Sequence, residues 1–130
     1  MKLDNVLNII AEDFEGADDQ QTFARLAEYI FTHKSDLQHL TYSFIAKVAG
    51  TKKPEKILQI TQYLLGERVK LLEIKFELII ENDIFQLDDE TIYHAETTGN
   101  LIHPETGYPV ENYDRFVYPY FVPSEELENG

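Results

Sequence analysis

The chain has 130 residues, of which 43% are hydrophobic and 27% are charged, and its formal net charge is −13. This composition is typical of a globular domain and excludes a disordered or collagen-like chain. The absence of cysteine excludes disulfides, thiolate metal sites and a cysteine nucleophile. No signal-peptide pattern follows Met1, and no apolar run reaches the roughly 18–20 residues of a membrane span. We therefore expect a cytoplasmic protein without a membrane partner.

The charge is distributed unevenly along the chain. Residues 1–40 have 3 basic and 8 acidic groups, residues 41–76 have 7 and 3, and residues 77–130 have 1 and 13. The overall negative charge disfavours nucleic-acid binding, because phosphates repel it, whereas a local basic segment favours it. The basic groups of the middle segment are Lys47, Lys52, Lys53, Lys56, Arg68, Lys70 and Lys75.

Two amphipathic helices are predicted before the basic segment. The first covers residues 3–14 and ends near Gly16. The second begins at Asp18 and Asp19, whose carboxylates favour the exposed amides of a helix start, and ends near His33. These apolar stripes are wider than a small helical motif needs, so we expect a homodimer through the two helices. The stripes consist of Leu3, Val6, Leu7, Ile10 and Phe14, and of Phe23, Leu26, Ala27, Ile30 and Phe31.

Two more helices are predicted in the basic segment. Thr41 is a suitable N-cap for a helix over residues 42–49, which Gly50 ends. Pro54 suits the first position of a helix over residues 54–65. For this last helix we expect a buried face of Ile57, Leu58, Thr61, Leu64 and Leu65, and an exposed face of Glu55, Lys56, Gln59, Gln62 and Tyr63.

The periodicity changes after Gly66. Apolar and polar residues alternate over residues 68–80, which favours a strand, although Val69, Leu72, Phe76 and Ile79 also fit a helix. A turn at 81–83 and a short strand at 84–87 complete a β-hairpin. Asp88 can cap a helix over residues 89–98 that ends at Gly99.

The C-terminal part is expected to be irregular. Residues 104–107 form a turn between two short segments, residues 116–122 are aromatic and flanked by prolines, and residues 124–130 are expected to fray. The expected organisation is a domain over residues 1–98 and an acidic, aromatic extension over residues 99–130, in an α+β fold.

Residues 45–50, with the sequence Ile-Ala-Lys-Val-Ala-Gly, resemble the first helix and turn of helix-turn-helix DNA-binding domains. Ala46 is small where the second helix crosses, and Gly50 permits the tight turn. With the following hairpin, the region over residues 20–87 resembles the winged helix-turn-helix family. That resemblance implies a DNA-binding regulator of transcription, with its second helix in the major groove of double-stranded DNA and the hairpin at the backbone. The implied DNA-binding residues are Lys47, Lys52, Lys53, Lys56, Gln59, Gln62, Arg68 and Lys70.

The chain departs from this family pattern in four places. Thr51 stands where an apolar residue is expected after the glycine, and the turn that follows, Lys52-Lys53-Pro54, is long. The helix over residues 54–65 contains no arginine, and the hairpin turn at 81–83 is acidic. An acidic wing repels phosphate, so the alternative is a protein-interaction module that contacts a basic partner through residues 77–130. The candidate partner-binding residues are Tyr113, Phe116, Tyr118, Tyr120 and Phe121. Such an aromatic cluster is more often part of a protein core, or of an arm packed over the domain, than a docking surface.

The sequence offers little support for an enzyme. The four histidines, at positions 33, 39, 94 and 103, are not at metal-ligand spacing, and no nucleophile elbow or phosphate loop is present. Asp88, Asp89 and Glu90 could bind a cation, but an exposed helix start explains them better. We therefore expect no metal, no cofactor and no catalytic residues.

Overall fold

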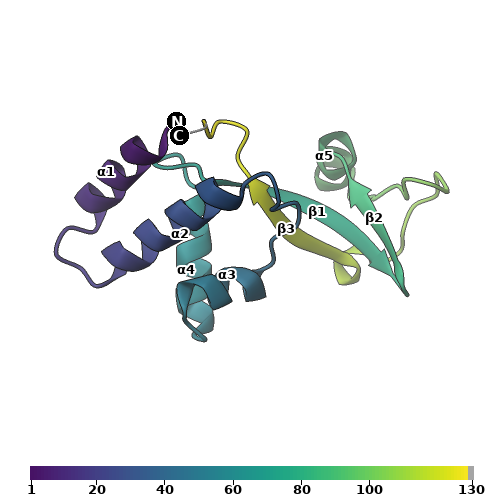
Figure 1. The fold of residues 1–130 in the computed structure, drawn as a ribbon. Helices are drawn as coiled ribbons and strands as arrows, with labels where there is room; N and C mark the ends of the chain where they lie inside the picture. The colour runs from purple at the N-terminus through teal and green to yellow at the C-terminus, as the bar shows by residue number, and fades with distance from the viewer. Residues whose placement is uncertain (129–130) are drawn as a thin grey trace. The chain divides into compact units, whose positions relative to one another are not determined.

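The computed structural model describes residues 1–128 and has a mixed α+β fold, as the sequence predicts (Figure 1). Two compact units are present: unit 1 contains residues 1–74 and the C-terminal segment from Phe121, and unit 2 contains residues 75–120. The expected boundary between residues 98 and 99 falls inside unit 2. The elements are α1 (Leu3–Asp13), α2 (Asp19–His33), α3 (Tyr42–Ala49), α4 (Pro54–Leu65), β1 (Leu72–Ile80), β2 (Asp83–Leu87), α5 (Asp89–Thr98), the 3₁₀ turn η1 (Tyr113–Arg115) and β3 (Val117–Pro123).

The two N-terminal helices lie side by side in unit 1 and bury their apolar stripes there (Figure 1). Val6 and Ile10 of α1 are fully buried, and Phe23 and Ile30 of α2 are nearly so. The reason we expected a homodimer was therefore wrong: the stripes are covered within the chain by α3, α4 and the strand ends. Burying apolar surface in one continuous core is the main favourable term in folding this unit.

Helix α4 begins and ends as predicted, but its buried face is rotated from the expected one. Ile60, Thr61 and Leu64 are buried, whereas the side chain of Leu58 is 48% exposed. Tyr63, which we expected on the exposed face, packs edge-on against the aromatic rings of Phe14 and Phe23. The apolar residues of α4 cover a wide arc of the helix, and their spacing alone does not determine which side of that arc faces the core.

The sheet has three strands in the order β2-β1-β3. The period-two pattern of residues 72–80 does form a strand, and β1 pairs with β2 from Phe76↔Leu87 to Ile80↔Asp83. Glu81 has a positive φ of 56° in the turn of this hairpin. The expectation of an irregular C-terminal part was wrong for residues 117–123, which form β3. Its residue Phe121 also bridges Leu40, just before α3, with both backbone hydrogen bonds 2.8 Å long.

The segment after β3 is anchored to unit 1. The amide of Ser124 donates to the carbonyl of Leu71 at 2.9 Å, and Leu127 is buried in the core. The expectation that residues 124–130 fray is therefore wrong for residues 124–128, and residues 129–130 lie outside the described part of the chain.

Unit 2 has its own small core, built around Leu78, Leu87, Ala95 and Leu101. Helix α5 begins as predicted, because the Oδ1 atom of Asp88 accepts a hydrogen bond from the amide of Thr91 at 2.8 Å. The predicted turn at 104–107 is also present. The amide of His103 donates to the carbonyl of Tyr108 at 2.9 Å, and Gly107 has a φ of +74°.

Candidate functional site

Helices α3 and α4 are joined by a tight turn that local residues determine. The hydroxyl of Thr41 caps α3 by accepting from the amide of Phe44 at 3.3 Å. Gly50 ends α3 with a φ of +76°, a left-handed conformation that side chains disfavour. Pro54 occupies the first turn of α4, where a missing amide hydrogen costs nothing. The turn therefore exposes Lys52 and Lys53 at the start of α4.

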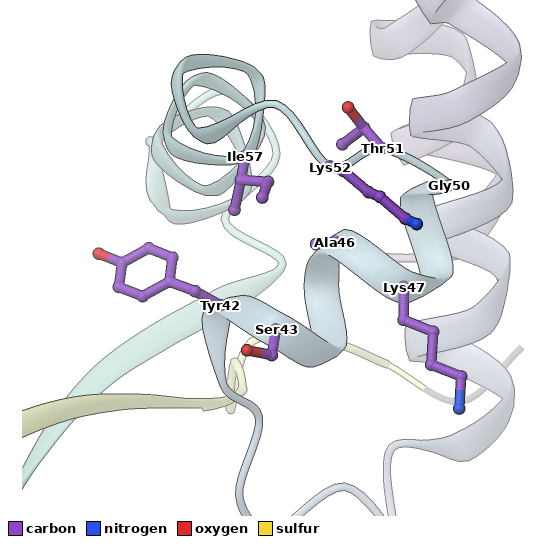
Figure 2. A pocket seen from close by; sticks show the side chains of 8 residues that line it. All are labelled: Tyr42, Ser43, Ala46, Lys47, Gly50, Thr51, Lys52 and Ile57. Atoms are coloured by element: carbon purple, nitrogen blue, oxygen red, sulfur yellow. The ribbon is translucent and has the colours of Figure 1, made fainter.

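An open pocket of about 580 Å³ lies between α3 and the first turns of α4. Figure 2 shows Ile57 projecting from α4 toward α3, with Lys52 in the turn and Lys47 on the last turn of α3. The remaining lining residues are Tyr42, Ser43, Ala46, Gly50 and Thr51. The pocket thus has an apolar floor and two lysines at one end.

Within the described part of the chain, three predicted DNA-binding lysines of this region have no acidic partner. Lys47, Lys52 and Lys53 are exposed, and none of them forms an ion pair within residues 1–128. A fourth cation is close to them: the guanidinium of Arg25 on α2 donates to the carbonyl of Ala49 at 3.1 Å. Arg25 is exposed and its positive charge lies beside the α3–α4 turn, so this group adds to the local positive charge.

The other three predicted cations are neutralised by carboxylates. Lys56 forms an ion pair with Asp19 at 2.5 Å, and Lys70 lies 3.4 Å from Glu126. Arg68 holds Asp13 with two hydrogen bonds, 3.2 Å from its Nε atom and 2.7 Å from its terminal nitrogen. A phosphate would have to compete with these carboxylates, so these three residues are weaker candidates for DNA contact than the free lysines.

Arg68 and Asp13 belong to a small hydrogen-bonded cluster. The Tyr63 hydroxyl donates to the same Asp13 carboxylate at 2.6 Å. The hydrogen bond from Arg68, followed by that from Tyr63, holds the pKa of Asp13 below its ordinary value of 3.8. Burial and the hydrogen bond to Asp13 raise the pKa of Tyr63 well above that of a free tyrosine. The cluster ties α4 and the segment after it to the end of α1, which is a structural role.

The exposed face of α4 carries side chains that can read base edges. Glu55, Leu58, Gln59 and Gln62 are all exposed, and their spacing of i, i+3, i+4 and i+7 places them on one stripe of the helix. Gln59 and Gln62 were predicted as DNA-binding residues, whereas Leu58 was expected in the core. The stripe combines amide donors and acceptors, a carboxylate and an apolar group.

The aromatic residues that we considered for partner binding are mostly packed inside the chain. Tyr120 and Phe121 are buried, while Tyr113 and Phe116 pack against the core of unit 2. Tyr118 is 47% exposed, and its hydroxyl donates to the carbonyl of Arg115 at 3.3 Å. Of the five, Tyr118 alone is exposed to solvent over a large part of its surface.

Residues 1–128 contain no group of three or more histidine, aspartate or glutamate side chains arranged to hold a metal ion. His33 lies against the ring of Tyr29, and His103 against that of Phe85. The Nδ1 atom of His103 accepts from the amides of Glu105 and Thr106, which fixes the turn at 104–107. Among the described helices, none has the length and apolar character to cross a bilayer.

Comparisons with protein-family models, with curated proteins and with solved structures give no match for this chain. The function of the chain therefore has to be inferred from the chemistry of the residues described above.

Proposed function

We propose that the chain is a winged-helix protein that binds double-stranded DNA through α3, the following turn and α4. The observation that carries this proposal is the exposed, unneutralised group of Lys47, Lys52 and Lys53 at the helix-turn-helix. Phosphate contacts from such lysines supply most of the affinity of DNA-binding proteins and fix their position on the duplex.

The order of elements supports the winged-helix assignment. A helix-turn-helix, α3 and α4, is followed by β1, and β3 returns beside it in the sheet. On this assignment the whole segment between β1 and β3, residues 81–116, forms the wing. The wing is then far larger than the simple hairpin over residues 68–87 that the sequence suggested, since it contains β2, α5 and η1.

The exposed stripe of α4 suggests what the protein reads in the major groove. Glutamine forms paired hydrogen bonds with adenine, and an apolar side chain packs against the methyl group of thymine. Gln59 and Gln62 can make the first contact and Leu58 the second. The helix has no arginine, which is the commonest reader of guanine. We therefore propose that the preferred site is rich in A·T pairs.

The acidic residues elsewhere in the chain set the conditions of binding. The net charge of −13 opposes association with any duplex, and like charges repel over a Debye length of about 8 Å at physiological salt. Binding should therefore be weak on unselected DNA, and its salt dependence should reflect the few phosphate contacts that the lysine face can make. Discrimination between sites then depends on the α4 stripe.

The test is a salt titration with fluorescently labelled duplexes selected from a random 20-base-pair pool. The change is the double substitution Lys52→Ala and Lys53→Ala. Because the slope of log K against log salt falls by about 0.9 for each phosphate that a lysine no longer neutralises, the double variant should reduce the slope by about 1.8. Fluorescence anisotropy at four or more salt concentrations measures it.

A matched control removes two lysines outside this face, Lys2 and Lys75, and changes the net charge by the same amount. It should keep the wild-type slope. If both double variants reduce the slope equally, the chain binds DNA through charge in general and the α3–α4 face has no special part. If the selection yields no duplex that the wild type binds at about 50 mM salt, the proposal is overturned.

The base-reading part is tested separately with Gln59→Ala and Gln62→Ala. Each substitution removes one pair of hydrogen bonds to a base and should weaken binding to the selected site by about 1–3 kcal/mol, with the salt slope unchanged. Affinity for an unselected duplex should stay the same. Equal weakening on both duplexes would remove α4 from the reading of sequence.

A further inference from the structure

Unit 2 carries a large excess of negative charge. Residues 75–120 contain 10 acidic and 2 basic residues. The ion pairs of the N-terminus, Lys56, Arg68 and Lys70 all have their carboxylates in unit 1, so these cations do not neutralise unit 2. A surface of this charge repels DNA and also a second copy of a chain with net charge −13, whereas it attracts a cationic partner.

Unit 2 also exposes large side chains that proteins usually bury. Tyr108 is 73% exposed, Tyr93 is 69% exposed and Ile84 is 62% exposed. Tyrosine is enriched where proteins bind one another, because it offers a large rigid surface with little loss of conformational entropy. Of these two tyrosines, Tyr93 lines a pocket, and we take the surroundings of that pocket as the candidate contact surface.

The pocket lies on the solvent-facing stripe of α5 and has a volume of about 450 Å³. Glu90, Tyr93, His94 and Thr97 follow one another at i, i+3, i+4 and i+7, so they share this stripe. Ile102, from the segment after α5, adds an apolar wall. The Thr97 hydroxyl donates to the backbone carbonyl of Tyr93 at 2.9 Å. Within residues 1–128 the carboxylate of Glu90 forms no ion pair, so it is open to a ligand together with the exposed ring of Tyr93.

We infer that this α5 pocket binds an arginine side chain of a basic protein segment. A guanidinium stacks on the face of a tyrosine ring and forms paired hydrogen bonds with a carboxylate. Tyr93 and Glu90 supply these two groups one helical turn apart, and the remaining acidic residues of unit 2 attract the rest of a basic segment. The site is separate in sequence and in chemistry from the lysine face of α3 and α4, so it goes beyond the proposed DNA binding.

The experiment measures binding of a labelled nine-residue peptide in which four arginines alternate with alanine and glycine. Fluorescence anisotropy is recorded with the full chain at low and physiological salt. The variant Glu90→Gln with Tyr93→Ala removes both contacts, and its dissociation constant should rise about tenfold or more. Both side chains are exposed, and circular dichroism verifies that the variant folds as the wild type does.

The matched control is Glu96→Gln with Tyr108→Ala. It removes the same two residue types from exposed positions of unit 2 outside the pocket. It should raise the dissociation constant by less than about twofold, because neither side chain touches the bound arginine in the proposed arrangement. Equal weakening in both double variants would overturn the pocket, because it would show attraction by charge alone.

Two further probes separate this inference from the proposed function. A peptide with lysine in place of arginine should bind more weakly, because an ammonium does not stack as a guanidinium does; equal binding of the two peptides would overturn the stacking on Tyr93. DNA binding by the Glu90 and Tyr93 variant should be no weaker than that of the wild type. Weaker DNA binding in this variant would show that α5 contacts the duplex, and would overturn the assignment to a basic protein segment.

Discussion

Unit 1 and unit 2 differ in how much apolar surface they bury and how much charge they expose. Unit 1 buries seventeen apolar residues in one core and pairs several of its charges across helices, whereas the core of unit 2 contains four buried residues. Unit 2 instead exposes nine of its ten acidic residues and three of the most exposed apolar side chains. The difference teaches that unit 1 has the larger buried core, while unit 2 presents the charged and aromatic surface on which we infer that a partner binds.

The largest expected effect concerns the core of unit 1. Leu64 is fully buried on α4, and Leu64→Ala should lower the free energy of unfolding by about 2–5 kcal/mol, because it removes buried methyl groups and leaves a cavity. Leu58→Ala, on the exposed side of the same helix, should cost less than about 0.5 kcal/mol. Urea unfolding followed by circular dichroism measures both. Similar destabilisation at the two positions would show that the stripe of α4 is assigned wrongly.

An intermediate effect concerns the cluster that holds α4 to the end of α1. Because the pKa of Asp13 is lower in the folded chain than its ordinary value of 3.8, ionised Asp13 stabilises the fold. This contribution is fully present above about pH 4 and is lost as the pH falls through the folded-state pKa. Arg68→Gln removes the main cause, so its thermal midpoint should be lower at pH 7 and should fall less below pH 4.

The control for this prediction is Lys70→Gln, which removes another cation paired with a carboxylate, Glu126 at 3.4 Å. Thermal unfolding by circular dichroism at half-unit pH steps compares the three proteins. The Lys70 variant should retain the wild-type fall below pH 4. If the Arg68 variant falls as steeply as the wild type, Asp13 is not the group that titrates.

The smallest effect should come from salt and should appear in unit 2. Its acidic residues repel one another, and salt screens this repulsion, so amide hydrogen exchange in β2 and α5 should slow as salt rises from about 10 to 150 mM. Glu105→Gln with Glu111→Gln should weaken this dependence by removing two exposed charges. If exchange of the amides of α1 and α2 slows equally, the salt effect is not specific to unit 2, and the predicted difference between the two units is wrong.

The helices were predictable because their signals are local. The ends of α3 and α4 are marked by backbone preferences that act within a few residues, at Thr41, Gly50, Pro54 and Gly66.

Strand β3 was missed because the signals that form it are not local. Pro119 lies inside it, and proline argues against a strand when a sequence is read alone. Its partners in the sheet are distant in sequence, and the bridge to Leu40 spans most of the chain.

The candidate site was predictable only in part, also because of long-range contacts. The basic segment and its exposed lysines follow from the sequence, but the carboxylates that neutralise Lys56, Arg68 and Lys70 lie 37, 55 and 56 residues away. Arg25 was missed because no local pattern connects α2 with the end of α3. The prediction of DNA binding itself stays a prediction.

The turn at 104–107 is a suitable place for a spectroscopic label. Its four residues are exposed. The turn is closed by two backbone hydrogen bonds, from the amide of His103 to the carbonyl of Tyr108 and from the amide of Gly107 to the carbonyl of His103. Because the chain contains no cysteine, Glu105→Cys would introduce a single thiol for a fluorophore or a spin label. A spectroscopic reporter at this position would record the tumbling of unit 2 in solution and the change in that tumbling when a ligand attaches.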